Sequence, residues 1–281
     1  AALLTADEHR AKNARGETDH LHLYNQSSDA PVLDLRITGM EQLTDGVTLY
    51  TFAHPEGHNL PEWSAGGHLD LVVAPEFLRP YSLMSDPADR SKYQIAVLRE
   101  DTGRGGSALL HRVFTLGRRI FVSKPVNHFE LVEDASHSLL MGGGIGVTPM
   151  IAFAHRLHTL GKPFNLHYSA STRAGAAFCD VLAAMPWAKH VHYHVSEEGT
   201  RADLSAIMSA LPQGSHVYTC GPDAYMQAVM DSTATANIPE EHRHLEYFST
   251  PEVPEYVNHP FTLRLSSGRE IAVPADQSAS D

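Results

Sequence analysis

The chain has 281 residues, 42% of them hydrophobic, and its 21 basic and 33 acidic side chains give a formal net charge of −12. This length and hydrophobic content predict two domains, each with its own core. The negative charge argues against a general nucleic-acid-binding protein and against docking on an anionic membrane. No apolar run approaches the roughly 20 residues of a membrane-spanning helix, and the polar N-terminus lacks a signal-peptide core, so we predict a cytoplasmic protein.

Only two cysteines occur, Cys179 and Cys220. This number excludes a disulfide framework, and also an iron–sulfur cluster or zinc site held by four thiolates of this chain alone. His190, His192 and His194 alternate as residues on one face of a strand do. Because no acid or cysteine is interleaved with them, we predict a solvated strand face and no metal site.

The first half of the chain predicts a small antiparallel β-barrel. Residues 1–29 are polar without periodicity and predict a loosely docked extension. Residues 30–134 contain short strand patterns separated by Gly, Pro, Asp and Asn, which is typical of such a barrel. The expected strands are 32–37, 47–52, 68–73, 93–99 and 119–123, with one helix at 107–114.

Residues 135–249 change to an alternation of strands and helices. The expected strands are 138–141, 164–170, 190–195, 216–220 and 244–248. The expected helices are 149–160, 174–185, 202–211 and 223–236. This alternation predicts a parallel sheet with helices on both faces, and such sheets bind ligands at the carboxyl ends of their strands.

A glycine-rich stretch, Gly-Gly-Gly-Ile-Gly at 142–146, follows the first of these strands. Thr148 is the predicted N-cap and Pro149 the predicted first residue of the next helix. A turn without side chains at a helix N-terminus predicts a phosphate site. The stretch departs from the dinucleotide fingerprint, because Pro149 stands where a third glycine is expected and no acid follows the second strand at 171–173. An ordinary glycine-rich turn that binds no phosphate therefore remains the alternative.

Two stretches of the barrel half also offer phosphate ligands. Arg-Pro-Tyr-Ser at 79–82, near a predicted strand start, supplies a guanidinium, a phenol and a hydroxyl. Gly-Arg-Gly-Gly-Ser at 103–107 opens the predicted helix, whose N-terminus favours an anion. Each stretch alone is equally compatible with a turn that carries a surface arginine.

The C-terminal part predicts a linker and a hairpin. Residues 250–260 contain three prolines. Residues 261–265 and 270–273 then predict two strands joined by a Ser-Ser-Gly turn. A lone hairpin is marginally stable, so we expect residues 261–281 to begin a third domain.

Five motifs in this order and spacing resemble the ferredoxin–NADP reductase superfamily. The nearest branch is that of phthalate dioxygenase reductase, which comprises the reductase components of Rieske-type oxygenases and demethylases. The motifs are Arg79-x-Tyr81-Ser82, Gly105-Gly106-Ser107, Gly-Gly-Gly-Ile-Gly-Val-Thr-Pro at 142–149, Cys220-Gly221-Pro222 and Glu246-Tyr247-Phe248. The resemblance covers residues 31–281. It implies a flavin-binding β-barrel (30–134), an NAD-binding α/β domain (135–249) and the start of a ferredoxin-like β-grasp domain with a [2Fe-2S] cluster. Since the four cysteine ligands are absent here, it also implies that this sequence is part of a longer chain.

The resemblance implies FMN as the flavin, from the Gly-Arg-Gly-Gly-Ser form of the second motif. By this mapping Arg79 and the turn Gly105-Gly106-Ser107 hold the phosphate, and Phe248 covers the ring face on which nicotinamide stacks. The further residues implied to approach the ribityl chain and isoalloxazine are Pro80, Tyr81, Ser82, Ala96 and Val97.

The resemblance also implies the NAD-binding residues. Gly143, Gly144, Thr148 and Pro149 would cradle the pyrophosphate. Thr172 and Arg173 would lie at the strand end that selects the nucleotide, with Cys220, Gly221 and Pro222 near the nicotinamide. The implied catalytic residues are Ser82, Cys220 and Phe248. For Cys220, a small buried residue at a strand end is the alternative. Family habit favours NADH, but an arginine and two hydroxyls also suit the 2′-phosphate of NADPH.

The implied function is a reductase component that passes electrons from NADH through FMN and a [2Fe-2S] cluster to an oxygenase. A nicotinamide delivers a hydride, whereas a cluster accepts single electrons, and a flavin converts between them. An FAD-dependent NAD(P)H:ferredoxin or flavin reductase is the alternative, against which the hairpin after Pro260 argues. A non-catalytic nucleotide-sensing module is the alternative from another class.

Overall fold

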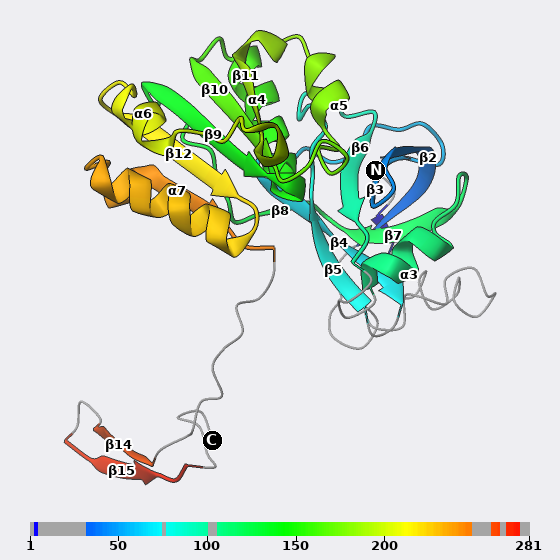
Figure 1. Ribbon diagram of the computed structural model, residues 1–281. Helices are drawn as coiled ribbons and strands as arrows, with labels where there is room; N and C mark the ends of the chain where they lie inside the picture. The colour runs from blue at the N-terminus through cyan, green and yellow to red at the C-terminus, as the bar shows by residue number, and fades with distance from the viewer. Residues whose placement is uncertain are drawn as a thin grey trace. The chain divides into compact units, whose positions relative to one another are not determined.

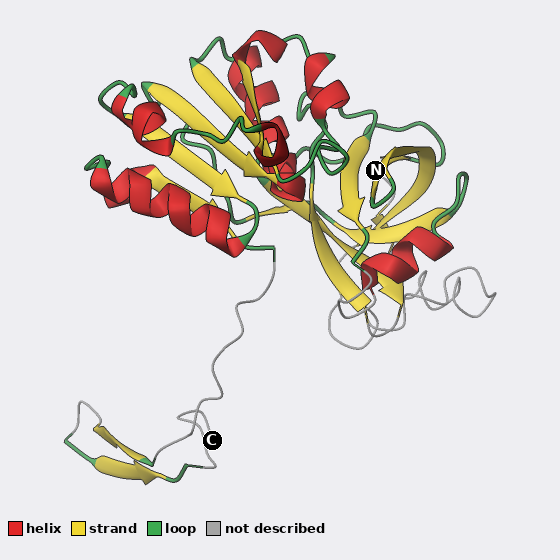
Figure 2. Ribbon diagram, in the orientation of Figure 1, coloured by secondary structure: helices red, strands yellow, loops and turns green. Residues whose placement is uncertain are grey.

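The computed structural model describes residues 3–4, 32–74, 77–100, 106–248, 260–264 and 268–275. Contacts between residues divide the chain into two compact units, Ala1–Phe248 and Ser249–Asp281. Figures 1 and 2 show the first unit as an antiparallel sheet beside a parallel sheet flanked by helices.

The antiparallel sheet has the strand order β5-β4-β7-β2-β3-β6. These strands are β2 (Val32–Thr44), β3 (Val47–Ala53), β4 (Gly67–Ala74), β5 (Phe77–Ser82), β6 (Tyr93–Leu98) and β7 (Arg119–Ser123). Two short strands join it, since β1 (Leu3–Leu4) pairs with β2 and β8 (Val126–Asn127) pairs with β4. The five strands that the sequence predicts are present, and β5 is the main addition.

The sheet closes into a barrel. Its end strands β5 and β6 contact each other, and just after β5 the Met84 N–H donates to the Gln94 carbonyl at 2.9 Å. Alternate apolar residues fill the interior, among them Leu35, Phe52 and Ile95. Helix α3 (Gly106–Val113) covers the barrel next to β4 and β5 and buries Leu110 in the same core.

The parallel sheet has the order β11-β10-β9-β12-β13. Its strands are β9 (His137–Gly143), β10 (Phe164–Ala170), β11 (Val191–Val195), β12 (Ser215–Cys220) and β13 (Arg243–Glu246). The helices are α4 (Val147–Thr159), α5 (Cys179–Ala183), α6 (Leu204–Ser209) and α7 (Asp223–Thr235). Short 3-10 turns are η2 (Gly144–Gly146), η3 (Ala188–His190), η4 (Ser196–Glu198) and η5 (Glu240–His242).

Side-chain alternation along β9 explains the two helix layers. Leu140 packs in a cluster with residues of α4 and α5. Its neighbours Leu139 and Met141 point to the opposite face, where residues of α6 and α7 cover them. The expected fold class, a flavin-type β-barrel followed by a parallel α/β sheet, is thus confirmed.

Several expected boundaries are wrong. The strand expected at 32–37 continues to Thr44 as β2. The helix expected at 174–185 is α5 alone, because a turn that Thr172 closes through the Gly175 N–H occupies its first residues. The strand expected at 244–248 ends at Glu246. Helix α4 begins at Val147 and Gly146 is its N-cap, so Thr148 and Pro149 lie inside its first turn. Proline is tolerated there because first-turn N–H groups have no intrahelical partner.

The second unit contains the predicted hairpin. Strands β14 (Phe261–Arg264) and β15 (Glu270–Val273) pair antiparallel, with Phe261 opposite Val273.

None of the helices in the described part of the chain has the length and apolar character that a bilayer crossing needs.

Candidate functional site

A pocket of about 320 Å³ lies where the end of β5 meets the chain at and after β13. We call it the Ser82–Glu246 pocket. Its lining residues are His68, Pro80, Ser82, His128, Leu245, Glu246, Tyr247 and Phe248. Three residues implied for the flavin, Pro80, Ser82 and Phe248, therefore come together from sequence positions far apart. Phe248 is 45% exposed here, so its ring is available to a ligand.

The other flavin candidates on β5 lie on its opposite face. Successive strand residues alternate between faces, and Arg79 and Tyr81 are not in the pocket lining. Tyr81 packs against the barrel core, and this burial raises the pKa of its phenol to about 12.

The side chains of Ala96 and Val97 on β6 also point to opposite faces of their strand. Ala96 belongs to the cluster that includes α4, whereas Val97 is fully buried in the barrel core. The Val97 side chain is therefore directed away from the pocket, and its carbonyl is 3.1 Å from His111 Nε2.

The start of α3 carries part of the predicted phosphate turn. Gly106 is the first residue of this helix and is buried. The Ser107 hydroxyl accepts the Glu100 N–H at 3.0 Å, which ties the helix start to the chain after β6. Gly105 lies outside the described residues.

Glu246 is a buried acid among the pocket residues to which the sequence assigned no role. Its Oε2 is buried and has no hydrogen-bond partner among the described residues. Burial raises the pKa of the Glu246 carboxyl to about 7, although a hydrogen bond with the Ser82 hydroxyl lowers it. The signal that was missed is the acid of the fifth motif, which lies inside the strand expected at 244–248 and at the carboxyl end of the observed β13.

Cys220 lies beside Glu246, since the two are register partners on β12 and β13. The Cys220 side chain is fully buried. Burial, and secondarily the nearby Glu246 carboxylate, raise the pKa of the thiol, so it remains protonated. Whatever Cys220 contributes at this site is made as a neutral thiol.

The glycines of the β9–α4 turn permit a close approach to the β12–α7 turn. A Cβ added to Gly146 would lie 2.4 Å from the Cys220 backbone, and one added to Gly143 would lie 2.8 Å from the Tyr225 ring and 3.1 Å from Pro222. Gly221 has φ +153° and lies against the Gly143 backbone. Gly144, with φ +55°, faces open space. Residues 143, 144, 221 and 222 therefore gather at the carboxyl edge of the sheet, as expected for a nucleotide site.

Thr148 and Pro149 shape this turn from within. Both are buried, and the Thr148 hydroxyl donates to the Ile145 carbonyl at 3.1 Å. The side chain of Thr148 is therefore used inside the protein, and the first-turn N–H groups of α4 are the groups suited to an anion.

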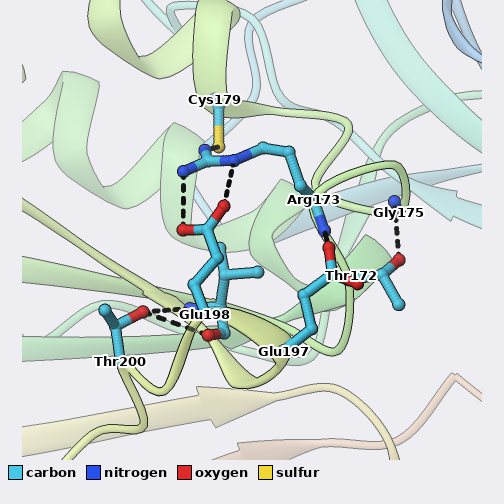
Figure 3. Close-up of polar contacts among 8 residues, drawn as sticks. Thr172, Arg173, Gly175, Cys179, Glu197, Glu198 and Thr200 are labelled. Atoms are coloured by element: carbon cyan, nitrogen blue, oxygen red, sulfur yellow. Dashed lines mark hydrogen bonds and ion pairs between the residues drawn. The ribbon is translucent and has the colours of Figure 1, made fainter.

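The edge after β10 differs from the sequence interpretation, which found no acid there. The η4 turn at the end of the neighbouring strand β11 brings Glu197 and Glu198 to this edge (Figure 3). Glu198 forms a two-pronged ion pair with Arg173, with Nε–Oε1 and Nη2–Oε2 distances of 2.8 Å. Glu197 Oε1 accepts the Arg173 backbone N–H, and Thr172 Oγ1 accepts the Gly175 N–H at 3.0 Å. The acids were missed because they follow the third strand of the sequence rather than the second.

No family model matches the sequence, but curated relatives do. The chain is 41% identical over 248 residues to the phenoxybenzoate dioxygenase subunit beta of Ectopseudomonas oleovorans, covering 88% of this chain and 76% of the relative. It is 35% identical to the carnitine monooxygenase reductase subunit of Escherichia coli (strain K12), covering 89% and 78%. It is 32% identical to the vanillate O-demethylase oxidoreductase of Pseudomonas sp. (strain HR199 / DSM 7063), covering 89% and 80%.

The chain belongs to the reductase subunits of oxygenases and demethylases. This reductase also matches the solved structure of phthalate dioxygenase reductase, described as a modular structure for electron transfer from pyridine nucleotides to [2Fe-2S]. The TM-score is 0.74 at 33% identity, and the match covers 88% of this chain and 78% of that one. The family that the five motifs predicted is confirmed, and the reductase is an oxidoreductase.

Proposed function

We propose that this reductase takes electrons from NADH into FMN and passes them, through a [2Fe-2S] cluster, to a Rieske-type oxygenase or demethylase. The observation that carries the proposal is the Ser82–Glu246 pocket. It brings the end of a barrel strand and the carboxyl end of a nucleotide-sheet strand to one place, as transfer between two bound ring systems requires.

The residues of this pocket fit a flavin. Glu246 Oε2 is buried without a hydrogen-bond partner among the described residues, so it offers a polar group to a bound ligand. Ser82 and the half-exposed Phe248 supply a hydroxyl and an aromatic face in the same pocket. When bound, FMN accepts electrons in pairs and releases them singly. We assign Pro80, Ser82 and Phe248 to its ring system, with Tyr81, Ala96 and Val97 supporting it from within the barrel.

The FMN phosphate has two proposed ligands. Arg79 supplies a guanidinium, and the start of α3, with Gly106 and Ser107, supplies N–H groups at a helix N-terminus. We include Gly105 in this turn from the sequence motif alone.

The nucleotide binds, in this proposal, at the carboxyl edge of the parallel sheet. The turn at Gly143 and Gly144 and the start of α4 hold its pyrophosphate, and Thr148 and Pro149 keep that turn in shape. The turn at Cys220, Gly221 and Pro222 lies next to the Glu246 end of β13, which directs the nicotinamide toward the same pocket. Thr172 and Arg173 follow β10 at the same edge of the sheet, where we place the adenine ribose.

The electron acceptor lies beyond the described barrel and parallel sheet. Phthalate dioxygenase reductase carries electrons to [2Fe-2S], and the hairpin β14–β15 supports a ferredoxin-like domain after residue 260. The cytoplasm remains the location that we predict from the sequence. An oxygenase as the partner agrees with the relatives' names.

The test is an anaerobic titration with NADH, followed in the visible spectrum, after the flavin released from the purified protein has been identified by mass. We expect FMN, and bleaching of its bands by one equivalent of NADH. Release of FAD would favour the NAD(P)H:ferredoxin or flavin reductase. A colourless protein that leaves NADH unchanged would favour the nucleotide-sensing module.

A further inference from the structure

We propose that Glu198 makes this reductase select NADH over NADPH, because it holds the Arg173 guanidinium away from a 2′-phosphate. The inference rests on the proposed function and names the residue that sets its nucleotide specificity.

The edge after β10 carries the two groups that dinucleotide-binding sheets use for opposite purposes. An arginine there accommodates the 2′-phosphate of NADP, and an acid hydrogen-bonds the 2′-hydroxyl of NAD. In this chain the arginine follows β10 and the acids follow β11, which run side by side with Ala170 opposite Val195. The edge carries an arginine and two acids. The contacts of these side chains therefore decide whether the edge suits NADH or NADPH.

Figure 3 shows that the guanidinium is already held on both sides. Its Nε and Nη2 donate to the two oxygens of Glu198, each at 2.8 Å, and its Nη1 lies 3.5 Å from the Cys179 sulfur. A phosphate prefers the same planar two-donor edge that Glu198 occupies. A 2′-phosphate must therefore displace a carboxylate before it gains the pair.

The charges around Arg173 add to this discrimination. Glu197 and Glu198 place two negative charges beside one positive charge, and Glu197 stays in place because its Oε1 accepts the Arg173 backbone N–H. Two carboxylates beside the arginine repel the dianionic 2′-phosphate of NADPH. Carboxylate oxygens instead accept hydrogen bonds from neutral ribose hydroxyls, so the same turn suits NADH.

The chain contains two matched controls for Glu198. Glu197→Gln removes the same charge from the same turn but leaves the ion pair of Arg173 intact. Glu133→Gln breaks an ion pair of the same two-pronged form, in which Arg156 Nε and Nη2 lie 2.6 and 3.0 Å from the two Glu133 oxygens. Arg156 lies in the last turn of α4. Only Glu198→Gln both removes a charge and releases Arg173.

The experiment measures binding by calorimetry with two probes that lack nicotinamide, 5′-AMP and 2′,5′-ADP. The purified flavoprotein is compared with Glu198→Gln, Arg173→Gln and the double variant. The wild-type protein should bind 2′,5′-ADP no more tightly than 5′-AMP. Glu198→Gln should bind 2′,5′-ADP at least about tenfold more tightly than the wild type does, the gain expected of one charge-assisted phosphate contact. Adding Arg173→Gln should abolish this gain. Glu197→Gln removes a repelling charge without releasing Arg173, so its gain should stay below about threefold, and Glu133→Gln should leave the preference unchanged.

Steady-state kinetics give the second readout. The ratio of kcat/KM for NADH to that for NADPH should fall at least about tenfold in Glu198→Gln. Wild-type preference for 2′,5′-ADP, an unchanged preference in Glu198→Gln, or a gain that survives removal of Arg173 would overturn the assignment. The binding arm needs no electron transfer, so it tests Glu198 even if the protein leaves NADH unoxidised, a result that contradicts the proposed function instead.

Discussion

Cys220 and Glu246 occupy the same register position at the carboxyl ends of the parallel strands β12 and β13. Burial raises the pKa of both side chains, that of Glu246 to about 7, so the thiol is neutral and the carboxyl is largely protonated below neutral pH. The end of the nucleotide-binding sheet therefore presents little negative charge to the Ser82–Glu246 pocket below pH 7. This matters because the pocket is where we place the flavin and nicotinamide rings, between which charge moves.

Replacing Glu246 should remove a pH dependence of stability. The carboxyl loses its proton near pH 7 in the folded protein but near 4.5 in the unfolded chain, so the folded state binds more protons between these values. Stability from this group therefore falls as the pH rises through that window. Glu246→Gln cannot ionise, and relative to the wild type it should gain about 1–3 kcal/mol in free energy of unfolding between pH 4.5 and 7.5. Urea unfolding at both pH values measures this.

Glu240→Gln is the control, because Glu240 is an exposed carboxyl just before the same strand. The free energy of unfolding of Glu240→Gln should differ from that of the wild type by the same amount at both pH values. A step near pH 7 in wild-type NADH oxidation that Glu246→Gln lacks would link the same group to the reaction. Equal pH dependence of stability in wild type and Glu246→Gln would contradict the assigned pKa.

Gly146→Ala should damage the proposed nucleotide site. The new Cβ would lie 2.4 Å from the Cys220 backbone, where neither backbone yields easily. We expect a loss of about 1–3 kcal/mol in stability, together with weakened binding of 5′-AMP. Gly46→Ala adds a Cβ 3.6 Å from Leu98, an ordinary contact, and should change neither quantity. Normal nucleotide affinity in Gly146→Ala would show that the close approach of the two turns is dispensable.

Asp34 should be the more costly of two ion-pair carboxylates to remove. It pairs with Arg119 across β2 and β7, and its side chain is only 4% exposed. Asp34→Ala leaves a partly buried guanidinium without this carboxylate and should cost about 2–4 kcal/mol in stability. Glu133→Ala breaks an exposed pair with Arg156 and should cost less than about 1 kcal/mol. Chemical unfolding compares them, and equal costs would argue against burial as the cause.

Arg79→Ala should weaken retention of FMN. A charge-assisted contact to phosphate is worth about 1.5–3 kcal/mol, so the dissociation constant of FMN should rise roughly 10- to 150-fold. Equilibrium dialysis of the flavin measures it. Arg36→Ala changes an exposed arginine of β2 and should leave it unaltered. An unaltered FMN affinity in Arg79→Ala would remove Arg79 from the proposed phosphate site.

Local patterns in the sequence determined the architecture. Alternating apolar residues predicted the barrel strands, and the 3.6-residue period after the glycine-rich turn predicted α4. The strand–helix alternation predicted a parallel sheet whose carboxyl edge gathers Gly143, Gly144 and Gly221. These features depend on neighbours within one element, which the sequence records directly. Near β5 the sequence predicted only a strand start and not the extent of the strand, because Pro80 lies inside it, where a proline weakens the strand pattern.

The tertiary structure alone decided which charged groups meet. Glu198 reaches Arg173 because β10 and β11 are neighbours in the sheet, although the two residues are 25 positions apart in the chain. Glu246 faces Ser82 because the end of β13 meets the end of a barrel strand. Its pKa depends on that burial, and the directions of Arg79 and Val97 away from the pocket depend on the pleat of their strands. Such contacts and desolvation arise only when distant segments pack, so no local pattern encodes them.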